Sequence, residues 1–165
     1  MDSNLRMLAL GIGSPEWVIE PAKRRGMKMI SLVGRPKHAA RALRAGADIL
    51  VAQGYDAGAR TGTVGTFSLV PRIVDVAGDA PVVAAGGVAT GRHIAAALAM
   101  GAQGVRIGTA WLLCAEEHTA PEVAAKLMAA ESADTVISRP TAARPSARSG
   151  LPGATPGPAT TPRRH

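Results

Sequence analysis

The hydrophobic pattern along most of the chain consists of short apolar runs that alternate with amphipathic segments. The apolar runs occupy residues 7–13, 27–33, 48–54, 81–87 and 104–109. Each is continuously apolar, as is typical of strands that are buried on both faces of a parallel sheet. Between them, apolar residues recur three and four positions apart, which predicts helices at residues 15–25, 35–45, 66–77 and 90–100.

The glycines and prolines of this pattern refine the prediction. Gly46 and Gly101 each end a helical segment shortly before a strand, where the left-handed conformation of a helix C-terminus favours glycine. Pro21 and Pro71 predict kinked or irregular early turns. Repeated strand–helix units with crossovers of this length predict an α/β fold with a parallel sheet.

Residues 139–165 have a different composition. They contain six of the twelve prolines and almost no apolar periodicity. Such a segment cannot bury enough surface to offset its ordering entropy, so we expect a disordered Pro/Arg-rich tail. Residues 1–138 are then the folded domain.

The charge distribution argues against a nucleic-acid partner. The formal charge is +7, but five arginines lie in the tail, and residues 1–138 hold the other 14 basic and all 12 acidic side chains. The four aromatic side chains offer little stacking surface for bases. No apolar run approaches the roughly 20 residues of a membrane span. The single cysteine, Cys114, suits a reducing compartment, and the cytoplasm is the expected location.

Glycine pairs follow two consecutive strand candidates and suggest a phosphate site. Gly86-Gly87 ends the fourth run and Gly108-Thr109 ends the fifth. Ligands of parallel α/β folds bind beyond the carboxyl ends of the strands, and glycine lets backbone N–H groups approach an anion. We also expect Thr109 to start a helix whose dipole favours the anion. Tight strand-to-helix corners would explain either pair by itself.

The third strand candidate ends at Gln53 and leads into a glycine-rich loop. Four glycines follow within twelve residues, at positions 54, 58, 62 and 65. A long glycine-rich loop in a compact domain is more often a binding loop than a spacer.

Three motifs in these regions resemble the nitronate monooxygenase (2-nitropropane dioxygenase) family. They read VAQGYDAGARTGTVGTFSLVPRIVD, PVVAAGGVATG and GAQGVRIGTAWL, within a match over residues 8–138. The resemblance implies an FMN-dependent TIM barrel that oxidises alkyl nitronates with oxygen and uses no metal.

The resemblance also implies roles for single residues. Gln53 and Gly58 would face the isoalloxazine ring, and Gly87 with the run Arg106-Ile107-Gly108-Thr109 would hold the phosphate end. Gly54 and Gly86 join them as cofactor-binding positions.

The sequence departs from the family at Arg60, which stands where the family has its catalytic histidine. A guanidinium has a pKa above about 12 and cannot act as a base near neutral pH. Nitronates, which are already deprotonated, are therefore expected substrates, whereas neutral nitroalkanes are not. The guanidinium could instead pair with the nitronate oxygens.

The number of strands also differs from the family. Five strand candidates stand where a (β/α)8 barrel has eight, so we expect a partial barrel that lacks the first three units. Its open sheet edges could support self-association.

Two alternatives stay open at this point. One is another reaction on the same flavin scaffold, such as NAD(P)H-dependent enoyl reduction. The other is a non-catalytic barrel fragment that acts only by association with another chain.

The remaining candidate residues have plainer expectations. His38, His93 and His118 are expected on helix surfaces, and Cys114 in the core. Tyr55 could cover a flavin face or pack the loop.

Overall fold

Five parallel strands form the centre of the computed structural model, which describes residues 5–11, 15–58, 61–138 and 146–149. The strands lie in the order β1-β2-β3-β4-β5, so that each pairs with the next along the chain. Their bounds are Met7–Leu10, Lys28–Val33, Ile49–Gln53, Val82–Ala85 and Gly104–Arg106.

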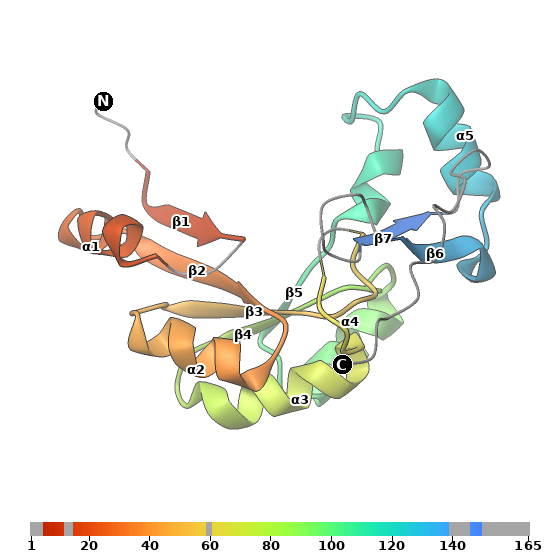
Figure 1. Ribbon diagram of the computed structural model, residues 1–165. Helices are drawn as coiled ribbons and strands as arrows, with labels where there is room; N and C mark the ends of the chain where they lie inside the picture. Colours follow the sequence, from red (N-terminus) through yellow and green to blue (C-terminus); the bar gives the residue numbers. More distant parts are fainter. Residues whose placement is uncertain (1–4, 12–14, 59–60, 139–145, 150–165) are drawn as a thin grey trace, which may run out of the picture.

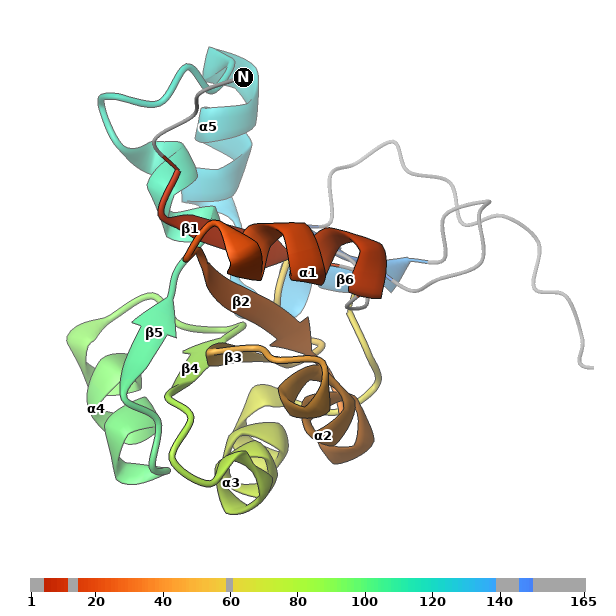
Figure 2. The same cartoon turned by 90° about the vertical axis from the view of Figure 1, so that its left-hand side faces the viewer.

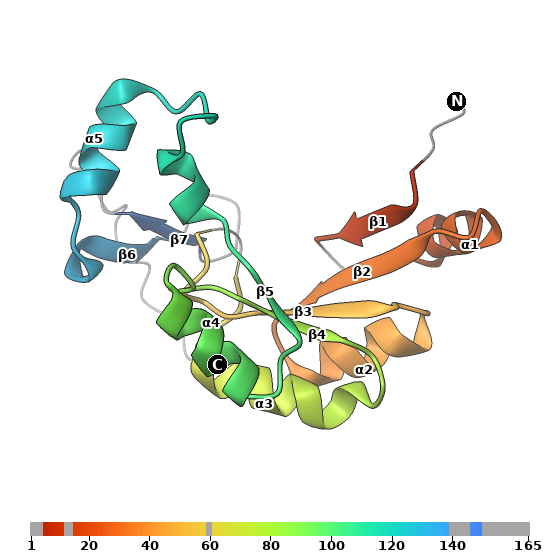
Figure 3. The same ribbon diagram turned by 180° about the vertical axis from the view of Figure 1, so that it is seen from behind.

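Helices follow the strands and pack on one face of the sheet (Figures 1 and 3). They are α1 (Glu16–Arg24), α2 (Pro36–Arg44), α3 (Thr66–Ala77) and α4 (Gly91–Ala99). Figure 2 shows α1 beside β1 and β2, and α4 beside β5. A consecutive strand order with helices on a single face is the winding of a βα barrel, because a doubly wound sheet carries helices on both faces.

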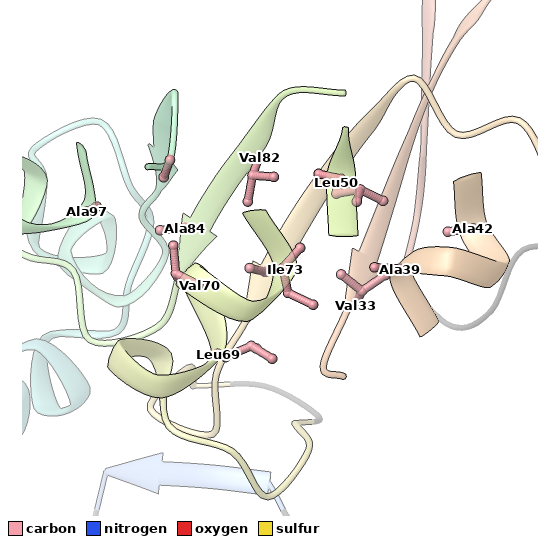
Figure 4. Packing of buried hydrophobic residues seen from close by; sticks show 13 residues of the cluster. Val33, Ala39, Ala42, Leu50, Leu69, Val70, Ile73, Val82, Ala84 and Ala97 are labelled. Atoms are coloured by element: carbon pink, nitrogen blue, oxygen red, sulfur yellow. The ribbon is translucent and has the colours of Figure 1, made fainter. Parts of the chain in front are cut away.

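The main core lies between the sheet and these helices (Figure 4). Leu50 and Val82 of the sheet and Leu69, Val70 and Ile73 of α3 are almost completely buried in it. Val33 joins the same cluster, whereas Ile19, Ala22 and Met29 form a smaller cluster under α1. Strand residues alternate between this helical face and the opposite, concave face.

The strands also meet in a polar contact at their amino-terminal ends. The Asp48 carboxylate accepts a hydrogen bond from the Met29 N–H at 2.8 Å and pairs with Lys28 Nζ at 3.2 Å. Burial acts to raise the pKa of Asp48, but these two partners and Lys23 outweigh it, so the pKa is lowered from 3.8. This end of a βα barrel contributes to stability, whereas ligands bind at the other end.

The chain continues past β5 into shorter elements. They are η1 (Thr109–Leu113), α5 (Pro121–Ala129), η2 (Ser132–Asp134), β6 (Thr135–Ser138) and β7 (Ser146–Ser149). The last two pair as an antiparallel hairpin. Residues 146–149, which lie within the expected disordered tail, form β7; the rest of the tail lies outside the described residues.

The α/β prediction is confirmed, with five parallel strands in the expected order and helices between them. All four helices lie where the periodicity placed them, within one residue at each end. Pro21 and Pro71 lie inside α1 and α3, so neither proline ends its helix.

Candidate functional site

The carboxyl ends of β3, β4 and β5 lie side by side, as the predicted ligand site requires. Gln53 pairs with Ala85, and Ala85 pairs with Arg106. One residue further, the Gly54 N–H donates to the Ala85 carbonyl at 3.0 Å. The loops after the three strands therefore leave the sheet together.

The glycine-rich loop after β3 folds back onto the sheet through Asp56 and Thr66. Asp56 Oδ2 accepts a hydrogen bond from the Thr66 N–H at 2.7 Å. The Thr66 hydroxyl donates to the Ala85 carbonyl at 3.2 Å. Because Thr66 is the first residue of α3, these bonds cap that helix and tie it to the end of β4. Neither role was foreseen from the sequence, since the two residues are ten positions apart.

Close packing with Thr66 explains two of the candidate glycines. A methyl group on Gly54 would lie within 2.6 Å of three Thr66 atoms. One on Gly86 would lie 2.7 Å from Thr66 Oγ1 and 2.9 Å from the Ala57 nitrogen. Neither position tolerates a side chain, so packing accounts for both glycines without a ligand.

The other candidate glycines are not explained by packing. Gly87 has φ of +70°, and a methyl group there would make only ordinary contact with Asp56. A methyl group on Gly108 would have no neighbouring atom within 4 Å. In the described part of the chain, the N–H groups of Gly87, Gly108 and Thr109 donate no hydrogen bond. Three backbone donors are thus available at the ends of β4 and β5.

The loop after β3 reaches across to the loop after β5. A methyl group on Gly58 would lie 3.1 Å from Thr109 Oγ1. The hydroxyl of Thr109 therefore faces Gly58, and the three motifs noted in the sequence converge at one end of the sheet. Within this loop, Thr61 Oγ1 is buried and has no hydrogen-bond partner among the described residues. Tyr55 packs against Gly65, at 3.2 Å from a methyl group built there.

Two helix starts lie beside the site, and the one after β5 differs from the expectation. Thr109 begins a five-residue 3₁₀ helix, which is too short to supply the dipole expected there. At α4, His93 Nδ1 accepts hydrogen bonds from the Ala89 and Thr90 N–H groups at 3.1 Å each. His93 therefore orders the first turn of α4 with its own side chain.

The remaining candidates are placed as follows. Gln53 is buried at the end of β3, on the concave face, and Ile107 follows the end of β5. Arg60 lies outside the described residues. Cys114 is a free thiol of intermediate burial, rather than the core residue expected.

Among the described residues, no cluster of three His, Cys, Asp or Glu side chains could hold a metal, and no helix is long and apolar enough to cross a membrane.

Two relatives with curated names resemble this chain over most of its length. Rv1533 of Mycobacterium tuberculosis, which is named as a monooxygenase, is 46% identical over 143 residues, or 86% of this chain. A (3aS,4S,5R,7aS)-5-hydroxy-7a-methyl-1-oxo-octahydro-1H-indene-4-carboxyl-CoA dehydrogenase of Rhodococcus jostii is 38% identical over 136 residues, or 82% of this chain. The chain spans 38% of the length of each of these relatives.

Solved structures share the fold. FabK from Thermotoga maritima superposes with a TM-score of 0.83 at 35% identity, over 88% of this chain and 47% of that protein. Nitroalkane oxidase from Streptomyces ansochromogenes superposes with a TM-score of 0.78 at 31% identity, over 88% of this chain and 45% of that protein.

A profile of the nitronate monooxygenase family matches residues 1–149. This match confirms the resemblance that the three sequence motifs indicated, and the structural likeness to FabK and nitroalkane oxidase agrees with a partial barrel. The chain therefore belongs to the nitronate monooxygenase family of flavin-dependent oxidoreductases.

Proposed function

We propose that this chain forms the phosphate-binding part of an FMN site in an oxidoreductase that oxidises alkyl nitronates with oxygen. The observation that carries the proposal is the convergence of three loops at the carboxyl ends of β3, β4 and β5, with Gly58 facing Thr109 Oγ1. Packing explains Gly54 and Gly86, and a φ of +70° favours glycine at position 87, whereas neither packing nor a positive φ explains Gly108.

The groups at this end of the sheet fit a phosphate monoester. The N–H groups of Gly87, Gly108 and Thr109 have no acceptor in the described part of the chain, and Thr109 adds a hydroxyl. An anion beyond the strand ends could accept hydrogen bonds from all four groups. The position of Gly108 is open, so that no described part of the protein blocks the approach.

The ring end of the cofactor would lie toward β3. The amide of Gln53 lies on the concave face at the end of β3. Gly58, in the loop that follows β3, has no side chain that would block the ring. The hydroxyl of Thr61, which has no partner among the described residues, lies in the same loop and could bond to a polar edge of the ring. When bound, FMN would supply the electron-accepting chemistry, while these residues bind and orient it. Arg60 keeps its proposed place near the substrate, in the position of the family histidine.

A fluorescence titration with FMN tests the proposal. Gly87→Val should weaken FMN binding by tenfold or more, because the side chain would block the anion's approach. Gly26→Val is the matched control, since Gly26 has φ of +68° against +70° for Gly87 and lies in the turn between α1 and β2. Both variants place valine at a backbone position of similar positive φ. Equal FMN affinity in both would remove Gly87 from the site.

A second candidate is an oxidoreductase that acts on a CoA thioester. The Rhodococcus jostii relative is named as a CoA-ester dehydrogenase and is 38% identical to this chain. The two candidates differ in the substrate that oxidises or reduces the bound flavin. Anaerobic mixing of the FMN-loaded protein with ethyl nitronate, or with an acyl-CoA, distinguishes them by which compound bleaches the flavin absorbance.

We also propose that residues 1–138 are the barrel part and 139–165 a tail, in a cytoplasmic protein. Self-association through the sheet edges is a further part of the proposal and rests on β1 and β5. Each of these strands pairs on one side only in the described sheet. An unpaired edge can accept another strand.

A further inference from the structure

Arg106 lies in a row of three side chains that the strand register places on the concave face. Gln53 pairs with Ala85, and Ala85 pairs with Arg106. Paired residues of a parallel ladder present their side chains to the same face. The preceding residues Ala52, Ala84 and Val105 all contact the helical core, so this row faces the other way.

The concave face carries little charge apart from Arg106. The strand positions that alternate onto it in the described sheet include no Asp or Glu, and two of them are cationic, Lys28 and Arg106. Lys28 is paired with Asp48 at the amino-terminal end of the sheet. Arg106 is exposed, and its side chain makes no ion pair or hydrogen bond with another described residue. The carboxyl-terminal end of the concave face is therefore cationic.

The position of Arg106 differs from that of the proposed phosphate site. The phosphate would bind to backbone groups beyond the strand ends, whereas Arg106 is still within β5 and in register with Gln53. Gln53 and Arg106 are two strand spacings apart, or about 10 Å. Ala85 between them contributes only a single methyl group to the row.

We propose that Arg106 binds the anionic group of the substrate. This inference rests on the proposed function and names the substrate class as a small planar anion with two oxygens, such as an alkyl nitronate. A guanidinium presents two parallel N–H groups that match such an anion, and it keeps its charge throughout the neutral range. This role differs from the one that the resemblance implied for Arg106, which was to hold the phosphate end with residues 107–109.

Binding of propionate tests this assignment without turnover. Propionate is a stable ion with the charge and the two oxygens of an alkyl nitronate. In a ¹⁵N NMR titration, the side-chain Nε–H signal of Arg106, identified by its loss in Arg106→Gln, should shift saturably with propionate. Arg106→Gln should weaken propionate binding about tenfold or more. Arg106→Lys keeps the charge but not the planar fork of donors. Its affinity for propionate should therefore lie between those of the wild type and Arg106→Gln. Arg72→Gln, an exposed position on α3, is the matched control and should bind as the wild type does.

Parallel FMN titrations separate this inference from the proposed function. Unchanged propionate binding in Arg106→Gln would overturn the inference. If the wild type still bound FMN, the proposed function would stand. A shift of the Arg106 signal with FMN, together with weaker FMN binding in Arg106→Gln, would also overturn it, because the guanidinium would belong to the cofactor. Propionate binding that depends on Arg106, in a protein that does not bind FMN, would support the inference and refute the function.

Discussion

The carboxylate of Asp56 accepts a hydrogen bond from the backbone N–H of Thr66 at 2.7 Å, so a residue of the β3 loop caps the helix that the loop leads into. The N-cap residue itself is Gly65, whose side chain cannot perform this task. The contact therefore ties the start of the loop, two residues before Gly58, to the start of α3. It also occupies the Thr66 N–H in the first turn of α3.

Replacing Asp56 should loosen both the helix and the loop. We expect Asp56→Ala to lower the free energy of unfolding by about 0.5–2 kcal/mol, the usual cost of a lost helix cap. Asp75→Ala, at an exposed position further along α3, is the control and should change stability by less than about 0.5 kcal/mol. Urea denaturation of the three proteins measures the difference. Equal stability of the two variants would show that the cap contributes nothing.

Two glycine-to-alanine variants should separate packing from ligand binding. Alanine at position 54 would place its methyl group 2.2 Å from Thr66 Oγ1, so Gly54→Ala should destabilise the fold strongly. Alanine at position 108 meets no atom within 4 Å, and φ there is −125°, so Gly108→Ala should leave the melting temperature nearly unchanged. It should still weaken FMN binding several-fold, because the methyl group lies in the path of the phosphate. Thermal melts and FMN titrations check both parts, and a Gly108→Ala variant with wild-type affinity would contradict the proposed site.

Asp48 should make stability depend on pH at the opposite end of the sheet. Its pKa is lowered from 3.8 in the folded state, because the bonds from Met29 and Lys28 outweigh the effect of burial. A lowered folded pKa gives a stability contribution that is present above the unfolded pKa and is lost as the pH falls through the folded value. Asp48→Asn should therefore be less stable than the wild type at pH 7, by up to about 1 kcal/mol, since the pair with Lys28 is largely exposed.

The same comparison at acid pH provides the control. Well below the ordinary carboxyl pKa of 3.8, the wild-type side chain is protonated and resembles the asparagine, so the two unfolding curves should approach each other. A stability difference that stays constant from pH 7 down to acid pH would mean that the charge of Asp48 is not responsible.

The sequence by itself determined the elements and their order, because strands and helices follow from local apolar periodicity. α3 has the predicted bounds, residues 66–77, since its apolar face repeats over the whole segment. Strand ends were extended too far, as for residues 104–109 against β5 at Gly104–Arg106, because the apolar composition continues into the loop. The glycine motifs also marked one end of the sheet, since parallel strands end on the same side.

Only the tertiary structure decided which residues meet there. The bond between Asp56 and Thr66 depends on the path of the loop. The need for glycine at positions 54 and 86 depends on the position of Thr66 in the folded chain, because a side chain at either position would collide with it. The row that joins Gln53 to Arg106 depends on the register of three strands, in which a shift of one residue would turn Arg106 toward the helices. Register and loop path arise from packing between distant segments, which leaves no local pattern in the sequence.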